Sequence, residues 1–317
     1  MINNFIKPGL QDLCVSRTSF DWGIPVQSDP KHVVYVWLDA LTNYITNIGY
    51  DVENCSDEFA YRWPCDLHLI GKDIIRFHTI YWPCFLFSLD LPQPKMVFGH
   101  PFLIMSDGKM GKSRGNVVYA DDLVEEFGVD AVRYFFLHEI PFATDGVFSR
   151  DLLMERINGD LANILGNLVQ RTISMGNKYF NGKVTNKNVV EEIDKDFLQM
   201  IHSLYGKVSE KMDDLQISDA ITEIFHLLRA SNKYIDDTAP WVLAKNDADK
   251  DRLETVLYHL LEAIRVSAVL LEAFLPDTSF KIFEQIHNNC KEFDYQDSNS
   301  YELGTPSPLF MRIDVTK

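Results

Sequence analysis

The chain has 317 residues, of which 46% are hydrophobic and 24% are charged, a composition typical of soluble globular proteins. The length allows two or three domains, and no apolar run is long enough to span a bilayer, so we expect a cytoplasmic protein without a membrane partner. The formal net charge of −16 argues against a broad nucleic-acid-binding surface, so any RNA contact must be confined to local basic patches.

The first part of the chain has the pattern of a parallel sheet with connecting helices. Residues 33–37 are β-branched and aromatic, which predicts a buried strand. Residues 66–71 and 95–100 predict two further strands, with a helical stretch containing Pro83 between them. A strand, a helix and a strand in this order indicate a βαβ unit. Ligands of such sheets bind at the carboxyl ends of the strands.

The rest of the chain has a helical pattern. Residues 121–127 and 129–137 predict two short helices, and Ser149 is placed to cap the start of a longer one. From there, apolar stripes at helical spacing predict a four-helix bundle. The first three stripes are Leu153, Ile157, Leu161, Ile164 and Leu168; Phe197, Ile201, Leu204 and Val208; and Ile221, Ile224, Phe225, Leu228 and Ile235. The fourth helix is expected from about Asp249 to Phe274, and the tail beyond Asp277 is polar and weakly patterned.

A lysine-rich loop carries the sharpest chemical signal. Residues 108–116 read Gly-Lys-Met-Gly-Lys-Ser-Arg-Gly-Asn. Glycines let a backbone approach a polyphosphate closely, and lysines can neutralise charge on a leaving pyrophosphate. A lone lysine-rich turn is more often an exposed basic hairpin. The whole string, however, resembles the Lys-Met-Ser-Lys-Ser loop of class I aminoacyl-tRNA synthetases, with Gly111 in place of the usual serine.

Two further strings resemble the methionyl-tRNA synthetase family. They are residues 35–44, Tyr-Val-Trp-Leu-Asp-Ala-Leu-Thr-Asn-Tyr, and residues 68–78, His-Leu-Ile-Gly-Lys-Asp-Ile-Ile-Arg-Phe-His. The resemblance implies that a methionine side chain is bound by Trp37, Ala40, Tyr44, Ile74 and His78. It implies that ATP is bound by Gly71, Lys72, Asp73, Lys112 and Ser113, and that the catalytic residues are Lys109 and Lys112.

The chemistry of these residue types agrees with this interpretation. A thioether is apolar and polarisable and suits aromatic neighbours, while a tyrosine hydroxyl and an imidazole can separate methionine from leucine. A carboxylate accepts hydrogen bonds from ribose hydroxyls well. Single aromatic residues such as Trp37 would more often be packing residues, and a single histidine such as His78 would more often be structural. The match of whole strings favours the functional interpretation.

A polar stripe in the helical part suggests RNA contact. Asn163, Asn167 and Arg171 are spaced four apart, which places them along one face of an α-helix. Such a line is most often a solvated face, but asparagine is unfavourable inside helices. The run resembles the anticodon-reading helix of the same family. Residues 239–245 resemble its partner segment, in which Trp241 stacks on a base, so the implied anticodon-binding residues are Asn167, Arg171 and Trp241.

The resemblance predicts an α/β part, the second half of a Rossmann-like parallel sheet, followed by an all-α anticodon-binding bundle. It divides the chain into a remnant of a connective insertion at 1–30, the second half of the catalytic domain at 31–118, a linking helical region at 119–148, the anticodon-binding domain at 149–276 and a C-terminal tail at 277–317. The family's first nucleotide-binding half, with its His-Ile-Gly-His motif, and most of the insertion are not found. We therefore expect these 317 residues alone to be inactive.

The predicted function is ligation of methionine to tRNA(Met) with ATP and Mg²⁺, by a chain that is expected to be a monomer. Five cysteines without paired spacing argue against a zinc knuckle, so we predict no metal site here and expect zinc only in the missing insertion. Two alternatives remain: a non-catalytic tRNA-binding module, and a related class I synthetase for another aliphatic amino acid. Methionine-dependent pyrophosphate exchange would distinguish the enzyme from the module.

Overall fold

The computed structural model describes residues 1–105, 108–109, 117–140 and 144–314. The chain forms two compact units, Met1–Phe102 and Leu103–Lys317, and each is described by itself. The first unit contains sheets and short helices, and the second contains a small sheet and a helical bundle. This agrees with the predicted order of an α/β part followed by an all-α part.

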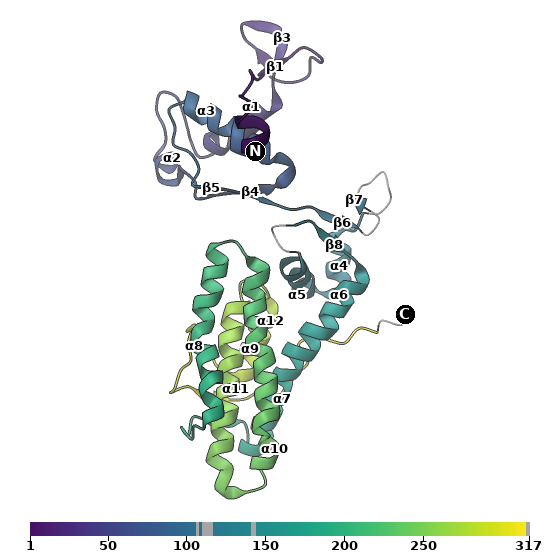
Figure 1. Ribbon diagram of the computed structural model, residues 1–317, viewed down its shortest axis with the longest axis vertical. Helices are drawn as coiled ribbons and strands as arrows, with labels where there is room; N and C mark the ends of the chain where they lie inside the picture. Colours follow the sequence, from purple (N-terminus) through teal and green to yellow (C-terminus); the bar gives the residue numbers. More distant parts are fainter. Residues whose placement is uncertain (106–107, 110–116, 141–143, 315–317) are drawn as a thin grey trace. The chain divides into compact units, whose positions relative to one another are not determined.

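The first unit begins with an antiparallel sheet in the order β1-β3-β2 (Figure 1). Its strands are β1 (Ser16–Arg17), β2 (Pro25–Val26) and β3 (Asp29–Val34). The strand predicted at residues 33–37 is wrong beyond Val34, because helix α1 (Val36–Thr46) begins almost at once. The β-branched run predicted a strand locally, but Leu41 and Ile45 are buried at helical spacing and the helix prevails.

The predicted βαβ unit is confirmed. Strands β4 (Leu67–Gly71) and β5 (Met96–His100) are parallel, with Leu67 opposite Met96 and Gly71 opposite His100. Between them lie a 3₁₀ turn (Lys72–Ile74), a π-helical segment (Phe77–Tyr81) and helix α3 (Trp82–Ser88). Pro83 stands in the first turn of α3, where a missing N–H costs least. Helices α1, α2 (Asp57–Arg62) and α3 share a core that includes Leu41, Trp82 and Leu86.

The second unit starts with a three-stranded sheet in the order β7-β6-β8. Strand β6 (Leu103–Met105) pairs antiparallel with β7 (Gly108–Lys109) and parallel with β8 (Gly146–Phe148). The sequence pattern did not predict β8. Helices α4 (Ala120–Phe127) and α5 (Val129–Tyr134) follow the predicted bounds closely, and a π-helical turn (Phe135–Glu139) extends α5.

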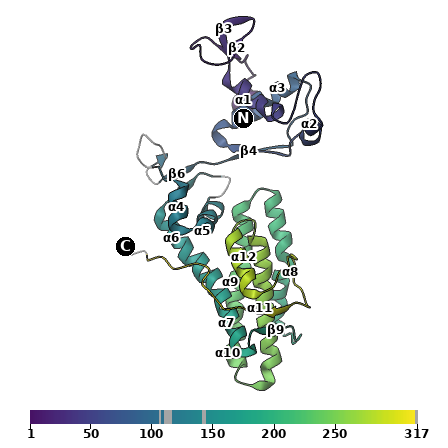
Figure 2. The same ribbon diagram turned by 180° about the vertical axis from the view of Figure 1, so that it is seen from behind.

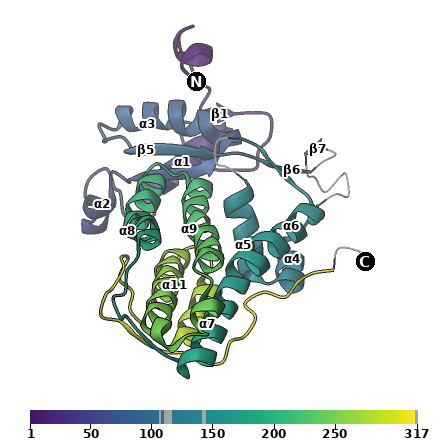
Figure 3. The same cartoon turned by 60° about the horizontal axis from the view of Figure 1, so that its bottom comes forward.

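A long helical segment then leads into the bundle. Helix α6 (Arg150–Arg156) is capped by Ser149, whose hydroxyl accepts a hydrogen bond from the Leu152 amide at 3.1 Å, as predicted. A ten-residue π-helical stretch, Ile157–Gly166, joins α6 to α7 (Asn167–Phe180). Helices α9 and α11 pack against α7, and α8 packs against α9 and α11 (Figure 3). The bounds are α8 (Glu192–Asp213), α9 (Ile217–Thr238), α10 (Pro240–Leu243) and α11 (Lys250–Leu271).

The weakly patterned region beyond residue 277 also contains regular elements. Helix α12 (Pro276–Ile286) packs on α11, and β10 (Ser300–Glu302) pairs antiparallel with β9 (Lys183–Thr185). The last described residues run along α6 and α7 (Figure 2). No helix in the described part of the chain is long and apolar enough to cross a membrane.

Candidate functional site

Helix α1 aligns three of the predicted pocket residues. Trp37, Ala40 and Tyr44 are separated by three and four positions, so they lie along one helical face. The adjoining face of α1 is fixed in the core by Leu41 and Ile45, and Trp37 packs against the same core. This buried stripe sets the rotation of the helix, so the pocket residues lie beside the core.

Tyr44 and His78 are joined by a hydrogen bond of 2.9 Å between the phenol oxygen and Nε2. The other ring nitrogen, Nδ1, lies 3.0 Å from the carbonyl oxygen of Ile74. A carbonyl only accepts, so Nδ1 donates, and Nε2 of the neutral ring accepts from the Tyr44 hydroxyl. Burial raises the pKa of Tyr44, which keeps this hydroxyl protonated.

Trp37 lies on the other side of His78. Its ring stacks on Phe77 with centroids 3.8 Å apart and planes 9° apart, and its centroid is 6.3 Å from that of His78. The structure thus brings together Trp37, Tyr44, Ile74 and His78, and places Ala40 on the same helical face. The sequence analysis had not singled out Phe77 as part of this group.

His68 is a second residue that the sequence analysis missed, although it begins one of the two quoted strings. It is buried under Tyr44, with ring centroids 4.4 Å apart, and its Nε2 lies 3.2 Å from the indole nitrogen of Trp82. The indole N–H can only donate, so Nε2 accepts and the ring is neutral. Burial, with a smaller effect of His78, lowers the pKa of His68 to about 4.

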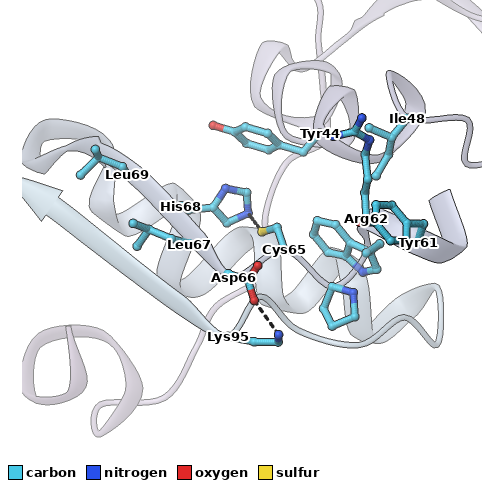
Figure 4. A pocket seen from close by; sticks show the side chains of 12 residues that line it. Tyr44, Ile48, Tyr61, Arg62, Cys65, Asp66, Leu67, His68, Leu69 and Lys95 are labelled. Atoms are coloured by element: carbon cyan, nitrogen blue, oxygen red, sulfur yellow. Dashed lines mark hydrogen bonds and ion pairs between the residues drawn. The ribbon is translucent and has the colours of Figure 1, made fainter. Parts of the chain in front are cut away.

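Tyr44 and His68 also line a cavity of 820 Å³ beside strand β4 (Figure 4). An ion pair between Lys95 and Asp66, with 2.5 Å between nitrogen and oxygen, lies at the start of the two parallel strands. Leu69 faces outward from β4 and is exposed. Tyr44 and His68 therefore border open space, whereas Trp37 and His78 do not line this cavity.

The predicted ATP-binding residues Gly71, Lys72 and Asp73 lie at the carboxyl end of β4. A methyl group on Gly71 would stand 2.5 Å from the Asp73 carboxylate, so a larger residue fits here only if that side chain shifts. The ammonium group of Lys72 lies over the ring of Phe102, 4.7 Å from its centroid. His100, which the sequence analysis did not select, ends β5 opposite Gly71.

The lysine-rich loop belongs to the second unit. Lys109 ends strand β7, which pairs with β6. Lys112 and Ser113 lie outside the residues that the structure describes. The geometry described for the site is therefore that of Trp37, Tyr44 and His78 and of the carboxyl end of β4.

The predicted RNA-contacting residues belong to helices α7 and α10. Asn167 begins α7, and Arg171 lies one turn later. A guanidinium nitrogen of Arg171 is 3.5 Å from a carboxylate oxygen of Asp236, which stands in the last turn of α9. Trp241 stands in α10 and is 44% exposed, so it is available for stacking. Trp241 follows Asp236 by five positions, which limits the distance between their Cα atoms to about 18 Å.

The side-chain oxygen of Asn163, the first residue of the predicted polar line, accepts a hydrogen bond from Arg312, in the C-terminal segment. The sequence pattern gave no sign of this contact, because the two residues are far apart in the chain.

Comparison with known proteins gives two family matches. The model of the class I (M) tRNA synthetases matches residues 1–173, and the model of the anticodon binding domain of methionyl tRNA ligase matches residues 184–306. The first match covers Trp37, Tyr44 and His78, the carboxyl end of β4, and also Asn167 and Arg171. The second covers Trp241.

Curated relatives are similar over the whole chain. The methionine–tRNA ligases of Clostridium acetobutylicum and Bacillus subtilis are 53% and 54% identical to it, over 100% and 99% of this chain. The matches cover 50% and 48% of those proteins, so the chain spans about half their length.

A solved structure, that of Mycobacterium tuberculosis methionyl-tRNA synthetase bound by methionyl-adenylate, is also similar. It is 41% identical, with a TM-score of 0.87, over 96% of this chain and 61% of that one. A family model that covers more than half of the chain, with relatives at this level of identity, shows that the chain belongs to the class I (M) tRNA synthetase family.

Proposed function

We propose that the protein containing this chain ligates methionine to tRNA(Met) in two steps. In the first step the methionine carboxylate attacks the α-phosphorus of ATP, methionyl-adenylate forms and pyrophosphate leaves. In the second step a hydroxyl of the terminal tRNA ribose attacks the carbonyl carbon of the adenylate, an ester forms and AMP leaves. The observation that carries this proposal is the hydrogen-bonded pair of Tyr44 and His78 next to Trp37. It combines an aromatic wall with one polar mark, which suits a thioether side chain.

We propose that Trp37, Ala40, Tyr44, Ile74 and His78 select the amino acid. Hydrophobic contacts discriminate by only about 1–3 kcal/mol per methylene, so a purely apolar pocket would admit leucine too readily. The fixed Tyr44 hydroxyl and His78 ring give the pocket a polar feature of defined direction. Because His78 is 1% exposed, its orientation is set by these two bonds rather than by water.

ATP is assigned to the carboxyl end of β4. In this proposal Gly71 allows close approach of ATP, Asp73 accepts hydrogen bonds from the ribose hydroxyls, and Lys72 acts beside them; the three residues lie together at the end of β4. Lys109, Lys112 and Ser113 are assigned to the phosphates, where lysine charge would offset the negative charge that grows as pyrophosphate leaves. In this reaction Mg²⁺ accompanies ATP as part of the substrate. The described residues include no cluster of three or more His, Cys, Asp or Glu side chains that could hold a metal ion.

We propose that the second unit reads the tRNA anticodon through Asn167, Arg171 and Trp241. RNA sequence is read best in single-stranded loops, where unpaired bases can stack on aromatic rings and present their pairing edges. In this proposal the exposed Trp241 supplies the stacking surface, and the guanidinium of Arg171 donates hydrogen bonds to a pairing edge. This mode also suits a chain of net charge −16, which cannot rely on a broad positive surface.

A second candidate function applies to the 317 residues taken alone. The curated relatives are about twice as long, and the RNA-contacting residues lie within this chain. We propose that the isolated polypeptide binds tRNA without activating methionine, since activation also uses the half of the synthetase that these residues do not include.

Pyrophosphate exchange tests both proposals. A complete synthetase containing this chain should catalyse methionine-dependent exchange between ATP and pyrophosphate, and leucine or valine should support it weakly. The 317-residue polypeptide should show no exchange but should retain binding to tRNA(Met). Exchange by the polypeptide alone would remove the second candidate, and failure of the complete protein to use methionine would remove the first.

A further inference from the structure

A small groove of 210 Å³ is lined by residues of the α6–α7 helical segment and of the C-terminal segment, here residues 307–314. We call it the C-terminal groove. Its lining residues are Ala162, Asn163, Gly166, Asn167, Gln170, Pro308, Leu309, Phe310 and Arg312. Asn167 thus belongs both to this groove and to the stripe that continues to Arg171.

The C-terminal segment is fixed against the helix by specific bonds. The side-chain nitrogen of Asn158 donates to the Ile313 carbonyl at 2.8 Å, and the Ile313 amide donates to the Asn158 side-chain oxygen at 2.8 Å. Arg312 donates to the side-chain oxygen of Asn163, and Leu309 is buried. The wall formed by the segment is therefore part of the folded structure.

The π-helical stretch explains why both asparagines reach the same segment. In an α-helix, residues five apart such as Asn158 and Asn163 would point about 140° away from each other. The wider turn of a π-helix, with its i to i+5 bonds, brings such residues toward the same side. π-helical irregularities occur frequently at functional sites.

The groove presents hydrogen-bonding groups that the fold leaves available. Asn163 uses its oxygen for Arg312, which leaves its amide nitrogen to donate. Among the described residues, no hydrogen bond engages the side-chain amides of Asn167 and Gln170. Phe310 adds an aromatic ring to the wall. None of the nine lining residues is acidic, in a chain with 46 acidic and 30 basic residues.

Amides, a guanidinium and an aromatic ring without a carboxylate are the groups that bind an unpaired nucleobase. We propose that the C-terminal groove holds one unpaired base of the tRNA anticodon loop, adjacent to the base read by Arg171 and Trp241. Gln170 and Asn163 contact the base edge, Phe310 contacts its face, and Arg312 contacts a base oxygen or the neighbouring phosphate. This inference rests on the proposed tRNA-binding function and deepens it.

The test uses the 317-residue chain and a fluorescent RNA hairpin with the anticodon stem and loop of tRNA(Met), with binding measured by anisotropy. Gln170→Ala and Arg312→Ala should each weaken binding about tenfold. Gln199→Ala, an exposed glutamine of α8, and Lys183→Ala, an exposed cation, are the matched controls and should change binding less than twofold. Because Gln170 is exposed and has no internal bond to lose, its variant should fold normally, which circular dichroism will check.

Hairpins with one abasic position identify the base. At a single loop position, removal of the base should abolish the effect of Gln170→Ala, and that position should differ from the one coupled to Trp241. If Trp241→Ala weakens binding while Gln170→Ala and Arg312→Ala do not, the groove only packs the C-terminal segment and the inference is wrong. If the unmodified chain does not bind the hairpin, the proposed tRNA-binding function fails, and the inference fails with it.

Discussion

Tyr44 donates a hydrogen bond to His78 across 2.9 Å, and His78 in turn donates to the Ile74 carbonyl at 3.0 Å. One phenol, one imidazole and one backbone carbonyl thus fix each other's direction. The two side chains come from α1 and the π-helical segment after β4. The polar feature of the proposed methionine pocket is therefore set by the packing of two elements, and its removal has a specific expected effect.

Tyr44→Phe removes the hydroxyl and keeps the ring. A hydrogen bond of this kind contributes about 0.5–1.5 kcal/mol. We expect the KM for methionine in the complete synthetase to rise about threefold to tenfold, with the KM for ATP unchanged. Tyr205→Phe, at an exposed tyrosine of α8 in the second unit, is the matched control and should have no effect. Equal increases in both KM values would show that the hydroxyl supports the fold rather than the pocket.

Gly71→Ala tests the strand end. The added methyl group would meet the Asp73 carboxylate at 2.5 Å, so this side chain must move away from its proposed position at the ribose. We expect kcat/KM for ATP to fall at least about tenfold, which corresponds to about 1.4 kcal/mol. Gly206→Ala in α8 is the control, since a methyl group there meets no atom within 4 Å, and helix propensity favours alanine by about 1 kcal/mol. An unchanged kcat/KM in the Gly71 variant would rule out this placement of Asp73.

The sequence predicted those elements whose local signals agree with their packing. Ser149 caps α6, and β4 and β5 form the expected parallel pair because a short apolar strand, a helix with Pro83 and a second strand allow few other arrangements. The pocket residues Trp37, Tyr44 and His78 lie together, although their roles stay predictions. They could be selected because two whole strings matched, whereas each residue alone was ambiguous.

Other features depend on contacts that no local pattern contains. Val33 and Val34 favour a strand, but the buried positions of the next residues favour a helix, so the predicted strand was too long. The π-helical stretch changes which residues share a face, so Asn163 turns to Arg312, a contact that only the folded chain creates. His68 was overlooked because its burial under Tyr44 depends on the packing of β4 against α1.

The ion pair between Arg252 and Asp194 should contribute strongly to the stability of the bundle. Its two bonds measure 2.6 and 2.8 Å, and the side chains are 6% and 0% exposed. Asp194→Ala removes the buried carboxylate and leaves the buried Arg252 guanidinium with the exposed Glu191, 3.4 Å away, so we expect urea unfolding to show a loss of about 3–5 kcal/mol. Asp66→Ala, which breaks the exposed pair with Lys95, should cost far less, because solvent screens an exposed pair. Similar losses in the two variants would contradict the importance of burial.

His259 should make the bundle sensitive to acid. Burial, assisted by Arg252, lowers its pKa to about 4 against the opposing effects of Asp194 and Glu262. The unfolded chain, with a histidine pKa near 6.5, binds a proton between these values that the folded chain does not. The contribution of His259 to the free energy of unfolding should therefore be constant above about pH 6.5. It should fall as the pH drops toward 4, by up to about 2 kcal/mol at pH 5.

His259→Gln should reduce this pH dependence, measured as the difference between the free energies of unfolding at pH 7.5 and pH 5. The expected sign is a smaller difference in the variant, whatever its loss of stability at pH 7.5. His226→Gln, at an exposed histidine of α9, should leave the difference unchanged. An unaltered pH dependence in the His259 variant would assign the acid sensitivity to other groups.

Trp241→Ala tests the proposed recognition of the anticodon. Stacking on an aromatic ring is worth about 1–3 kcal/mol per base, so binding of tRNA(Met) should weaken about fivefold to 150-fold. Adenylate formation by the complete synthetase should be unchanged, because the amino-acid pocket is assigned to residues of the first unit. Val242→Ala, at the exposed neighbouring residue, is the matched control and should bind normally. The variant should also lose most of its preference for a methionine over a valine anticodon; if that preference is retained in binding assays, Trp241 does not read the base.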